Sequence, residues 1–334
     1  KPKWLGNVYS SSQAPLFLNY WNQLTPENAS KWGSVEGTRD QMNWGELDAA
    51  YALAKSNALP FRFHVLVWGG QQPAWINDLS AEEQLQEITE WYEAVNERYP
   101  DIDYIDVVNE PLHQRPDGQS GEADYWDALG GPGETGFDWV ITAFEMARDI
   151  FPSETKLMIN DYGIISSSQA VNQYLQIINA LKSRGLIDGI GVQAHAFNNG
   201  SALSSGTTPA TIKWNLDALA TSDLPIHVTE LDIDGNPNLD DNGSEAYQLQ
   251  KYQEIFPVFW EHPAVEGVTL WGWRPGMWRT DQEAYIFDQR PKDALEWLED
   301  YVDTANVVFA VSNEDLGLNT PTRFALQQNY PNPF

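Results

Sequence analysis

The sequence predicts a single α/β domain, a (β/α)8 TIM barrel. Short apolar runs alternate with longer segments of helical period from one end of the chain to the other. Eight such runs occur, and one strand per helix favours a parallel sheet that closes into a barrel. A length of 334 residues with 42% hydrophobic side chains is compatible with one barrel around a large core.

The predicted elements follow in chain order. The strands are Trp4–Tyr9, Tyr20–Thr25, Phe61–Val67, Tyr104–Asn109, Lys156–Asp161, Gly189–Ala194, Ile226–Leu231 and Gly267–Trp271. The helices are Trp44–Ser56, Ala81–Arg98, Phe137–Ile150, Ser168–Arg184, Thr211–Thr221, Ser244–His262 and Lys292–Tyr301. Ser80 has N-cap chemistry ahead of one helix, and Gly185 marks the end of another. These boundaries place the barrel at residues 1–303.

Residues 304–334 are expected to form a linker. The segment from Phe324 to Phe334 resembles the opening of the C-terminal sorting domain used for type IX secretion in Bacteroidetes-like bacteria. The alternative is an accidental proline-rich tail. The resemblance implies a secreted or cell-surface bacterial protein. Since the chain begins at Lys1 without an apolar leader, we expect it to be a piece of a longer protein.

The charge balance restricts the partners. With 48 acidic and 19 basic residues the formal net charge is −29. Such a surface repels nucleic acids and anionic membranes, so we expect neither as a partner, and a neutral substrate fits best. Adaptation to salt is an alternative source of the acidic excess. The chain has 15 Trp, whose faces pack in cores or match the apolar faces of sugar rings. We expect a monomer.

Polar and aromatic side chains terminate nearly every predicted strand. In a barrel these ends meet at the carboxyl face, where active sites lie. The side chains at this rim are Glu27, Asn28 and Lys31 after the second strand, His64 and Trp68 on and after the third, Asn109 and Glu110, Asn160 to Tyr162, Gln193 and His195, Glu230, and Trp271. A purely structural barrel does not need so many charges, amides and indoles on one rim.

Glu110 and Glu230 each follow or close an apolar strand, on opposite sides of the predicted barrel mouth. Cleavage of a glycosidic bond needs two carboxyl groups, one to protonate the leaving oxygen and one to attack the anomeric carbon or to activate water. A single glutamate at a strand end is more often a surface ion pair. Two of them in this setting predict a glycosidase.

Six motifs in the correct order resemble family 10 glycoside hydrolases, the xylanase family. They are Asn19–Asn28 with Lys31 and Trp32, His64–Trp68, Asp106–Glu110, Asn160–Tyr162, Gln193–His195 and Val228–Asp232. The resemblance covers about residues 1–303. It implies a retaining endo-β-1,4-xylanase that acts on xylan and xylo-oligosaccharides without a metal or an organic cofactor.

The resemblance also implies roles for single residues. Glu110 is the expected general acid/base and Glu230 the nucleophile. His195 orients Glu230, Gln193 supports the nucleophile side, and Asn109 binds the 2-hydroxyl of the sugar being cleaved. The expected substrate-binding residues are Glu27, Asn28, Lys31, His64 and Gln71 on the non-reducing side, Trp68, Trp271 and Trp278 as cleft walls, and Tyr162 on the leaving-group side.

Some features depart from the family pattern or leave alternatives open. Gly69-Gly70 stands where the family commonly has His, and the Trp271–Trp278 loop carries Arg274. Arg274 could bind an acidic side group or pair with an Asp. Asp232 is expected to be structural, although the oxygen-rich run that it begins leaves a non-EF-hand cation site open. The alternative functions are a glucanase or mannanase on the same barrel, or a non-catalytic carbohydrate-binding barrel.

Overall fold

The structure, a computed structural model, describes residues 3–314 and contains one eight-stranded parallel sheet in the order β2-β1-β8-β7-β6-β5-β4-β3. Its strands are β1 (Trp4–Tyr9), β2 (Leu24–Pro26), β3 (Arg62–Val67), β4 (Tyr104–Asn109), β5 (Lys156–Asp161), β6 (Gly189–Val192), β7 (Ile226–Leu231) and β8 (Val265–Leu270). A parallel bridge between Leu24 and Phe61 joins β2 to β3 and brings the sheet round on itself. The predicted (β/α)8 barrel is therefore confirmed.

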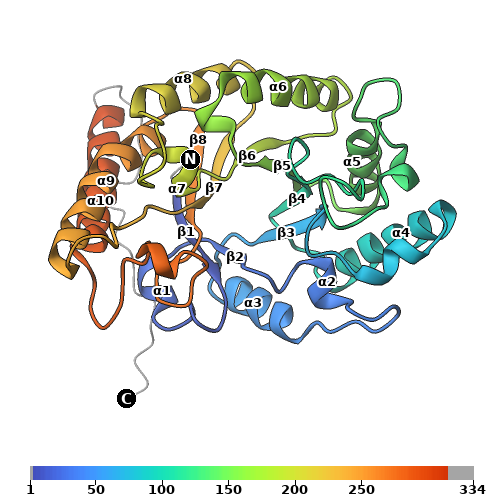
Figure 1. Cartoon of the computed structure of the whole chain (residues 1–334), viewed down its shortest axis with the longest axis horizontal. Coiled ribbons are helices and arrows are strands. Elements are labelled where there is room, and N and C mark those ends of the chain that lie inside the picture. Colours follow the sequence, from blue (N-terminus) through green and yellow to red (C-terminus); the bar gives the residue numbers. More distant parts are fainter. Residues whose placement is uncertain (1–2, 315–334) are drawn as a thin grey trace.

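Helices surround the strands on the outside of the barrel (Figure 1). The α-helices are α1 (Phe17–Tyr20), α2 (Trp32–Val35), α3 (Gly45–Ser56), α4 (Ala81–Arg98), α5 (Asp138–Ile150), α6 (Ser168–Lys182), α7 (Ala196–Asn199), α8 (Pro209–Ala220), α9 (Asp241–Trp260) and α10 (Asp293–Glu314). Short 3-10 turns are η1 (Ala74–Asp78), η2 (Trp126–Leu129), η3 (Ile164–Ser166) and η4 (Thr280–Gln282).

The core lies between the strands and the inward faces of the helices. All six residues of β3 and of β7 are buried, as expected for parallel strands covered on both faces. Helix α4 begins with a capping box, in which the Ser80 side chain accepts from Glu83 N and the Glu83 carboxylate accepts from Ser80 N. Such local signals explain why its predicted boundaries agree with the structure.

Two predicted elements differ from the structure by more than three residues at one end. The predicted strand from Tyr20 to Thr25 is only three residues long, because Phe17–Tyr20 forms a helical turn. The closing helix, expected to end near Tyr301, continues to Glu314, so the predicted domain boundary at residues 303/304 falls inside α10. The predicted sorting segment lies outside the described residues. Within residues 3–314, no helix is both long and apolar enough to cross a membrane.

Candidate active site

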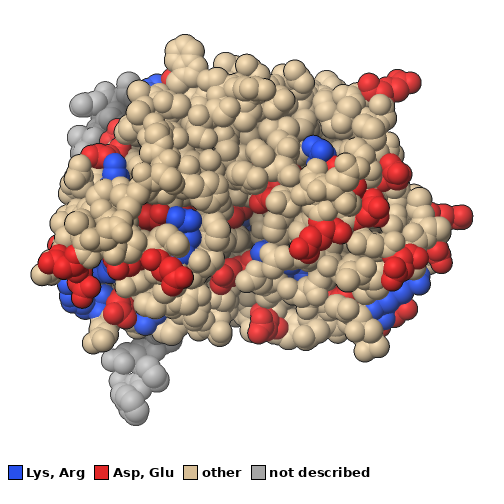
Figure 2. Space-filling model, viewed as in Figure 1, with Lys and Arg blue, Asp and Glu red and all other residues tan. Residues whose placement is uncertain are grey.

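A cavity of about 450 Å³ opens at the carboxyl ends of the strands. Figure 2 shows the hollow near the centre of the face viewed in Figure 1, with charged atoms on its walls. Every residue proposed from the sequence for the site lines this cavity. The lining comprises Glu27, Asn28, Lys31, His64, Trp68, Gln71, Asn109, Glu110, Gln114, Tyr162, Gln193, His195, Phe197, Glu230, Trp271 and Trp278. Of these, only Gln114 and Phe197 had not been proposed.

Glu110 directly follows β4 with a positive φ of 56° and is 8% exposed. Its carboxylate accepts hydrogen bonds from Gln193 Nε2 at 2.9 Å and from Trp68 Nε1 at 3.0 Å. Burial raises the pKa of Glu110, the charges of Glu230 and Asp161 add to this effect, and the two hydrogen bonds only partly offset it. The group is thus suited to hold a proton, as a general acid must.

Glu230 lies on β7 and is 4% exposed. Burial alone would raise the pKa of Glu230, but the hydrogen bond from His195, the fields of His64 and His195, and the hydrogen bond from Asn160 outweigh it and lower the pKa. The carboxylate is therefore held ionised, as a nucleophile must be.

His195 connects Glu230 to Asp232. Its Nε2 lies 3.2 Å from Glu230 Oε2, and its Nδ1 lies 2.7 Å from Asp232 Oδ2. Burial lowers the pKa of His195, but the charge of Asp232 and the hydrogen bonds to both carboxylates raise it to about 9. The ring is therefore cationic near neutral pH. The expected contact of His195 with Glu230 is present, and Asp232 pairs with a base, as expected for a structural residue.

A chain of amide side chains joins the two glutamates. Asn160 Nδ2 lies 2.7 Å from Glu230 Oε1 and 2.9 Å from Asn109 Oδ1. Gln193 Nε2 lies 3.3 Å from the same Asn109 oxygen and 2.9 Å from Glu110 Oε1. The side chain of Gln193, which was expected on the nucleophile side, donates to Glu110, while its backbone oxygen accepts from Glu230 N at 3.0 Å. Asn160 supplies the amide side-chain contact to Glu230.

On one side of the cleft, Lys31 organises a polar cluster. Its Nζ donates to Asn28 Oδ1 at 2.8 Å and to Gln71 Oε1 at 2.6 Å, and it lies 5.2 Å from the ring centre of Trp68. Burial lowers the pKa of Lys31 to about 8, although the charges of Glu230, Glu27 and Glu110 oppose this. The cluster offers several donors and acceptors to the hydroxyl groups of a bound sugar.

His64 and Trp271 form the floor of the cleft next to this cluster. His64 is 2% exposed, its Nδ1 lies 3.0 Å from Asp106 Oδ2, and the peptide bond to Val65 is cis. The His64 ring meets the edge of Trp271 with ring centres 5.3 Å apart. Asp106 also binds Arg62, so that His64 is held in one orientation.

The opposite rim carries aromatic side chains that were only partly foreseen. Tyr162 stacks on His113 with ring centres 3.9 Å apart, and Asp161 fixes His113 through Nδ1 at 2.7 Å. Phe197, on α7, lies with its ring centre 6.2 Å from those of both Tyr162 and Trp278. His113 was missed because it follows Glu110 within a loop. Phe197 was missed because its neighbour His195 carried the motif.

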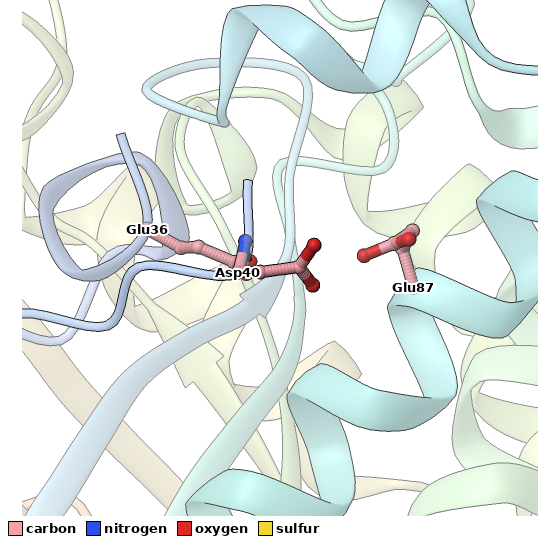
Figure 3. A group of neighbouring side chains, drawn as sticks. All are labelled: Glu36, Asp40 and Glu87. Carbon is pink, nitrogen blue, oxygen red and sulfur yellow. Dashed lines mark hydrogen bonds between the residues drawn. The ribbon is translucent and has the colours of Figure 1, made fainter. Parts of the chain in front are cut away.

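Acidic groups elsewhere do not need a metal to explain them. Among the described residues, one group of three carboxylates, Glu36, Asp40 and Glu87, has oxygens within 4.8 Å of one another (Figure 3). Glu36 accepts from Trp32 Nε1 and Asp40 N, and Arg39 pairs with Glu87. These contacts account for the group, and we assign no ion to it.

The run beginning at Asp232 is likewise accounted for by side-chain pairs. Arg279 binds Asp234 and lies 3.5 Å from Asp232 Oδ1. Arg274 lies over the rings of Trp273 and Phe287, at 5.2 and 4.5 Å, rather than beside an Asp, and it is not among the residues that line the cleft.

A barrel with two buried carboxyl groups at its mouth, one tuned to keep a proton and the other to lose it, has the site of a glycoside hydrolase. The comparisons with known proteins agree. Residues 5–301 match the model of glycosyl hydrolase family 10, and the chain belongs to this family.

The curated relatives include endo-1,4-beta-xylanase B of Cellvibrio japonicus, 39% identical over 302 residues, which cover 89% of this chain and 45% of that protein. Endo-1,4-beta-xylanase A of Caldicellulosiruptor saccharolyticus is 31% identical over 274 residues, 77% of this chain and 76% of that protein. The chain thus spans less than half of the first relative and about three quarters of the second.

Solved structures agree on the fold. Xylanase 10B of Thermotoga maritima matches with a TM-score of 0.77 at 23% identity, over 91% of this chain and 96% of that one. A family 10 structure from Paenibacillus barcinonensis matches with a TM-score of 0.77 at 25% identity, over 91% of this chain and 95% of that one.

Proposed function

We propose that this chain is a retaining endo-β-1,4-xylanase that hydrolyses the xylan backbone by double displacement. The observation that carries this proposal is the opposite tuning of Glu110 and Glu230 within one cleft. Burial raises the pKa of Glu110, whereas His195 and Asn160 lower the pKa of Glu230 against the effect of its burial. Two carboxyl groups of different protonation state can work as an acid and a nucleophile at one pH.

In the first step Glu230 attacks the anomeric carbon and forms a covalent glycosyl-enzyme, while Glu110 transfers its proton to the departing glycosidic oxygen. In the second step Glu110, now a carboxylate, takes a proton from water, and the resulting nucleophile releases the sugar from Glu230. Trp68 Nε1 and Gln193 Nε2 stabilise the Glu110 carboxylate between the two steps. No step requires a metal or an organic cofactor.

Xylan is the proposed substrate because the curated relatives are endo-1,4-beta-xylanases and the polar cluster fits a neutral sugar. Lys31, Asn28 and Gln71 hold one another in place, so their remaining donors and acceptors are preorganised for hydroxyl groups. Trp68 and Trp271 supply apolar walls of the cleft beside these three residues.

The substrate assignment is tested by reducing-end release from linear β-1,4-xylan, carboxymethylcellulose and β-1,4-mannan under the same conditions. We expect release from xylan and at least a 100-fold lower rate on the other two. Glu230→Ala is the matched variant, which should bind xylan without cleaving it. Cleavage of glucan or mannan without cleavage of xylan would overturn the substrate, and binding without turnover by the parent would indicate a carbohydrate-binding barrel.

We also propose that the longer protein to which this chain belongs is exported through type IX secretion. We further propose that the barrel works as a monomer. Export rests on the resemblance of residues 324–334 to a sorting domain, which lies outside the described residues. Fractionation of the native host tests it, because a secreted enzyme is found in the medium or on the cell surface. Sedimentation equilibrium measures the mass of the barrel in solution and so tests whether it is a monomer.

A further inference from the structure

One face of the molecule differs from the rest in charge. The exposed side chains of α6 up to residue 179 are all amides or hydroxyls: Ser168, Gln169, Asn172, Gln173, Gln176 and Asn179. The segment of residues 203–210, which leads into the first turn of α8, also has no charged residue. In Figure 2 the area over α6 shows few red or blue atoms, whereas α8 exposes one ion pair, Lys213 with Asp217, whose side chains are 63% and 51% exposed. We call the exposed residues of 168–179, residues 203–210 and Trp214 the uncharged face.

The contrast with other helices shows that this face is unusual for the chain. Helix α4 exposes Glu82, Glu83, Glu90, Glu93 and Glu97. The chain as a whole has a net charge of −29 and 20% charged residues. An acidic protein gains solubility from distributed carboxylates. A broad area without them therefore suggests that charge is unfavourable for what this area contacts.

Trp214 stands at the outer edge of this face. It is 69% exposed, the most exposed of the large hydrophobic side chains among the described residues, and it lies on α8 opposite the buried Ile212 and Leu216. Single exposed apolar residues are common. Here, however, two further large apolar side chains are exposed in the connection between β6 and α8: Leu203 is 56% exposed and Phe197 is 37% exposed.

The segments that carry the uncharged face are hydrogen-bonded to those at the rim of the catalytic cleft. Phe197 and Tyr162 line the cleft. Gly163 follows Tyr162 and Asn198 follows Phe197. These two residues are hydrogen-bonded, because Gly163 N donates to Asn198 Oδ1 at 3.1 Å. Gly163 leads into η3, and η3 is bonded to α8, because Asn215 Nδ2 donates to Ile165 O at 2.8 Å. The route from the rim of the cleft to α8 is therefore built of directly bonded segments.

We propose that the uncharged face is a secondary binding site for a neutral β-1,4-xylan chain, with Trp214 as its stacking residue. This inference rests on the proposed function. Amide and hydroxyl side chains can exchange hydrogen bonds with sugar hydroxyls without the desolvation cost of a charge. The indole presents a rigid apolar face to a pyranose ring. Because the same polymer can occupy cleft and face together, a weak second contact raises the overall affinity for long chains only.

The test compares Trp214→Ala with Trp214→Tyr, which keeps an aromatic ring, and with Leu85→Ala, which removes a 39% exposed apolar side chain from the acidic α4. Binding is measured by native affinity electrophoresis in gels that contain linear xylan. Activity is measured separately on polymeric xylan and on xylotetraose. We expect Trp214→Ala to weaken retardation and raise the KM for the polymer by ~3–10-fold, with unchanged kcat/KM on xylotetraose. Trp214→Tyr and Leu85→Ala should behave as the parent.

Equal retardation of Trp214→Ala and the parent would overturn the inference. So would a parallel loss of activity on xylotetraose, since that indicates a change in the cleft. Self-association of the parent that Trp214→Ala abolishes, without a change in xylan retardation, would assign the face to a second copy instead. If the parent cleaves no xylan, the proposed function fails. Gels with hydroxyethylcellulose or xylan then show separately whether Trp214 binds a neutral glycan, and retardation by hydroxyethylcellulose alone would overturn the xylan assignment.

Discussion

Asn160 donates a hydrogen bond from Nδ2 to Glu230 Oε1 at 2.7 Å, from a position at the end of β5 that is fully buried. The side-chain oxygen Oδ1 of Asn160 accepts from Thr229 Oγ1 at 2.7 Å, so the side-chain amide cannot turn over without losing both contacts. Glu230 thus has one oxygen held by Asn160 and the other by His195. This arrangement fixes the direction in which the carboxylate can attack.

We predict that Asn160→Ala lowers kcat/KM on xylan roughly 100-fold, because a preorganised hydrogen bond to the reacting group is lost. The same loss removes a contact that lowers the pKa of Glu230. Activity requires ionised Glu230, so the acidic limb of the pH profile should move to higher pH. Asn215→Ala, which removes a buried amide on α8, is the control. A profile that moves equally in both variants would show that Asn160 acts only through stability.

Trp68→Phe should move the basic limb of the profile to higher pH. The Trp68 Nε1 hydrogen bond lowers the pKa of Glu110 against the effect of burial, so its removal raises the pKa further. Activity requires protonated Glu110 and is lost as the pH rises through that pKa. The pH dependence of kcat/KM checks this, and a basic limb that stays in place or moves to lower pH contradicts it.

Asp232→Asn should lower the pKa of His195 and so reduce its positive charge at neutral to alkaline pH. The charge of Asp232 and its hydrogen bond raise the pKa of His195 to about 9 against the effect of burial. Without that charge the lowering effect of burial on the pKa of His195 is opposed less, and the pKa of Glu230 should rise. NMR titration of the His195 ring measures the first change and the acidic limb of the activity the second. Asp234→Asn, which removes a partner of Arg279, should produce a much smaller shift of His195.

Lys31→Met should stabilise the fold at pH 7 and impair binding. The folded pKa of Lys31 is about 8, below the ordinary 10.5, so the unfolded chain binds more protons between these values and stability rises with pH there. Below pH 8 the full cost of burying the charge is present. Replacing Lys31 by Met removes this buried charge and should raise the free energy of unfolding by about 1–3 kcal/mol.

Denaturant unfolding at several pH values checks the effect of Lys31→Met, since the gain should shrink as the pH approaches 10.5. The KM for xylan should rise roughly 10-fold because the cluster with Asn28 and Gln71 loses its centre. A variant that is less stable than the parent at pH 7 would contradict this account of Lys31.

The fold and the membership of the cleft could be predicted because both depend on local patterns. Buried strands such as β7 read as apolar runs, and the barrel brings their carboxyl ends together whatever lies between them. Glu110 and Glu230 each follow or close such a run. Most of their neighbours also stand at strand ends, whereas Gln71 and Trp278 were predicted only from the resemblance to family 10 glycoside hydrolases.

The partner of each side chain could not be predicted from the sequence. Gln193 follows β6, from which a long amide side chain could reach either glutamate, and only the shape of the barrel directs it to Glu110. Gln114 lies in the loop after β4 and Phe197 on the four-residue helix α7, which are too short or irregular for periodicity to mark the residues that face the cleft. The end of α10 was misplaced because residues 302–314 carry no glycine or proline to mark where the helix stops.

The central claim is that Glu230 forms a covalent intermediate with the sugar and Glu110 resolves it. The anomeric configuration of the first product tests this most directly, by following xylotetraose hydrolysis with proton NMR in the first minutes, before mutarotation. The account predicts that the β-anomer appears first and the α-anomer follows by mutarotation. Initial appearance of the α-anomer would mean direct attack by water and would contradict the assignment of Glu230 as the nucleophile.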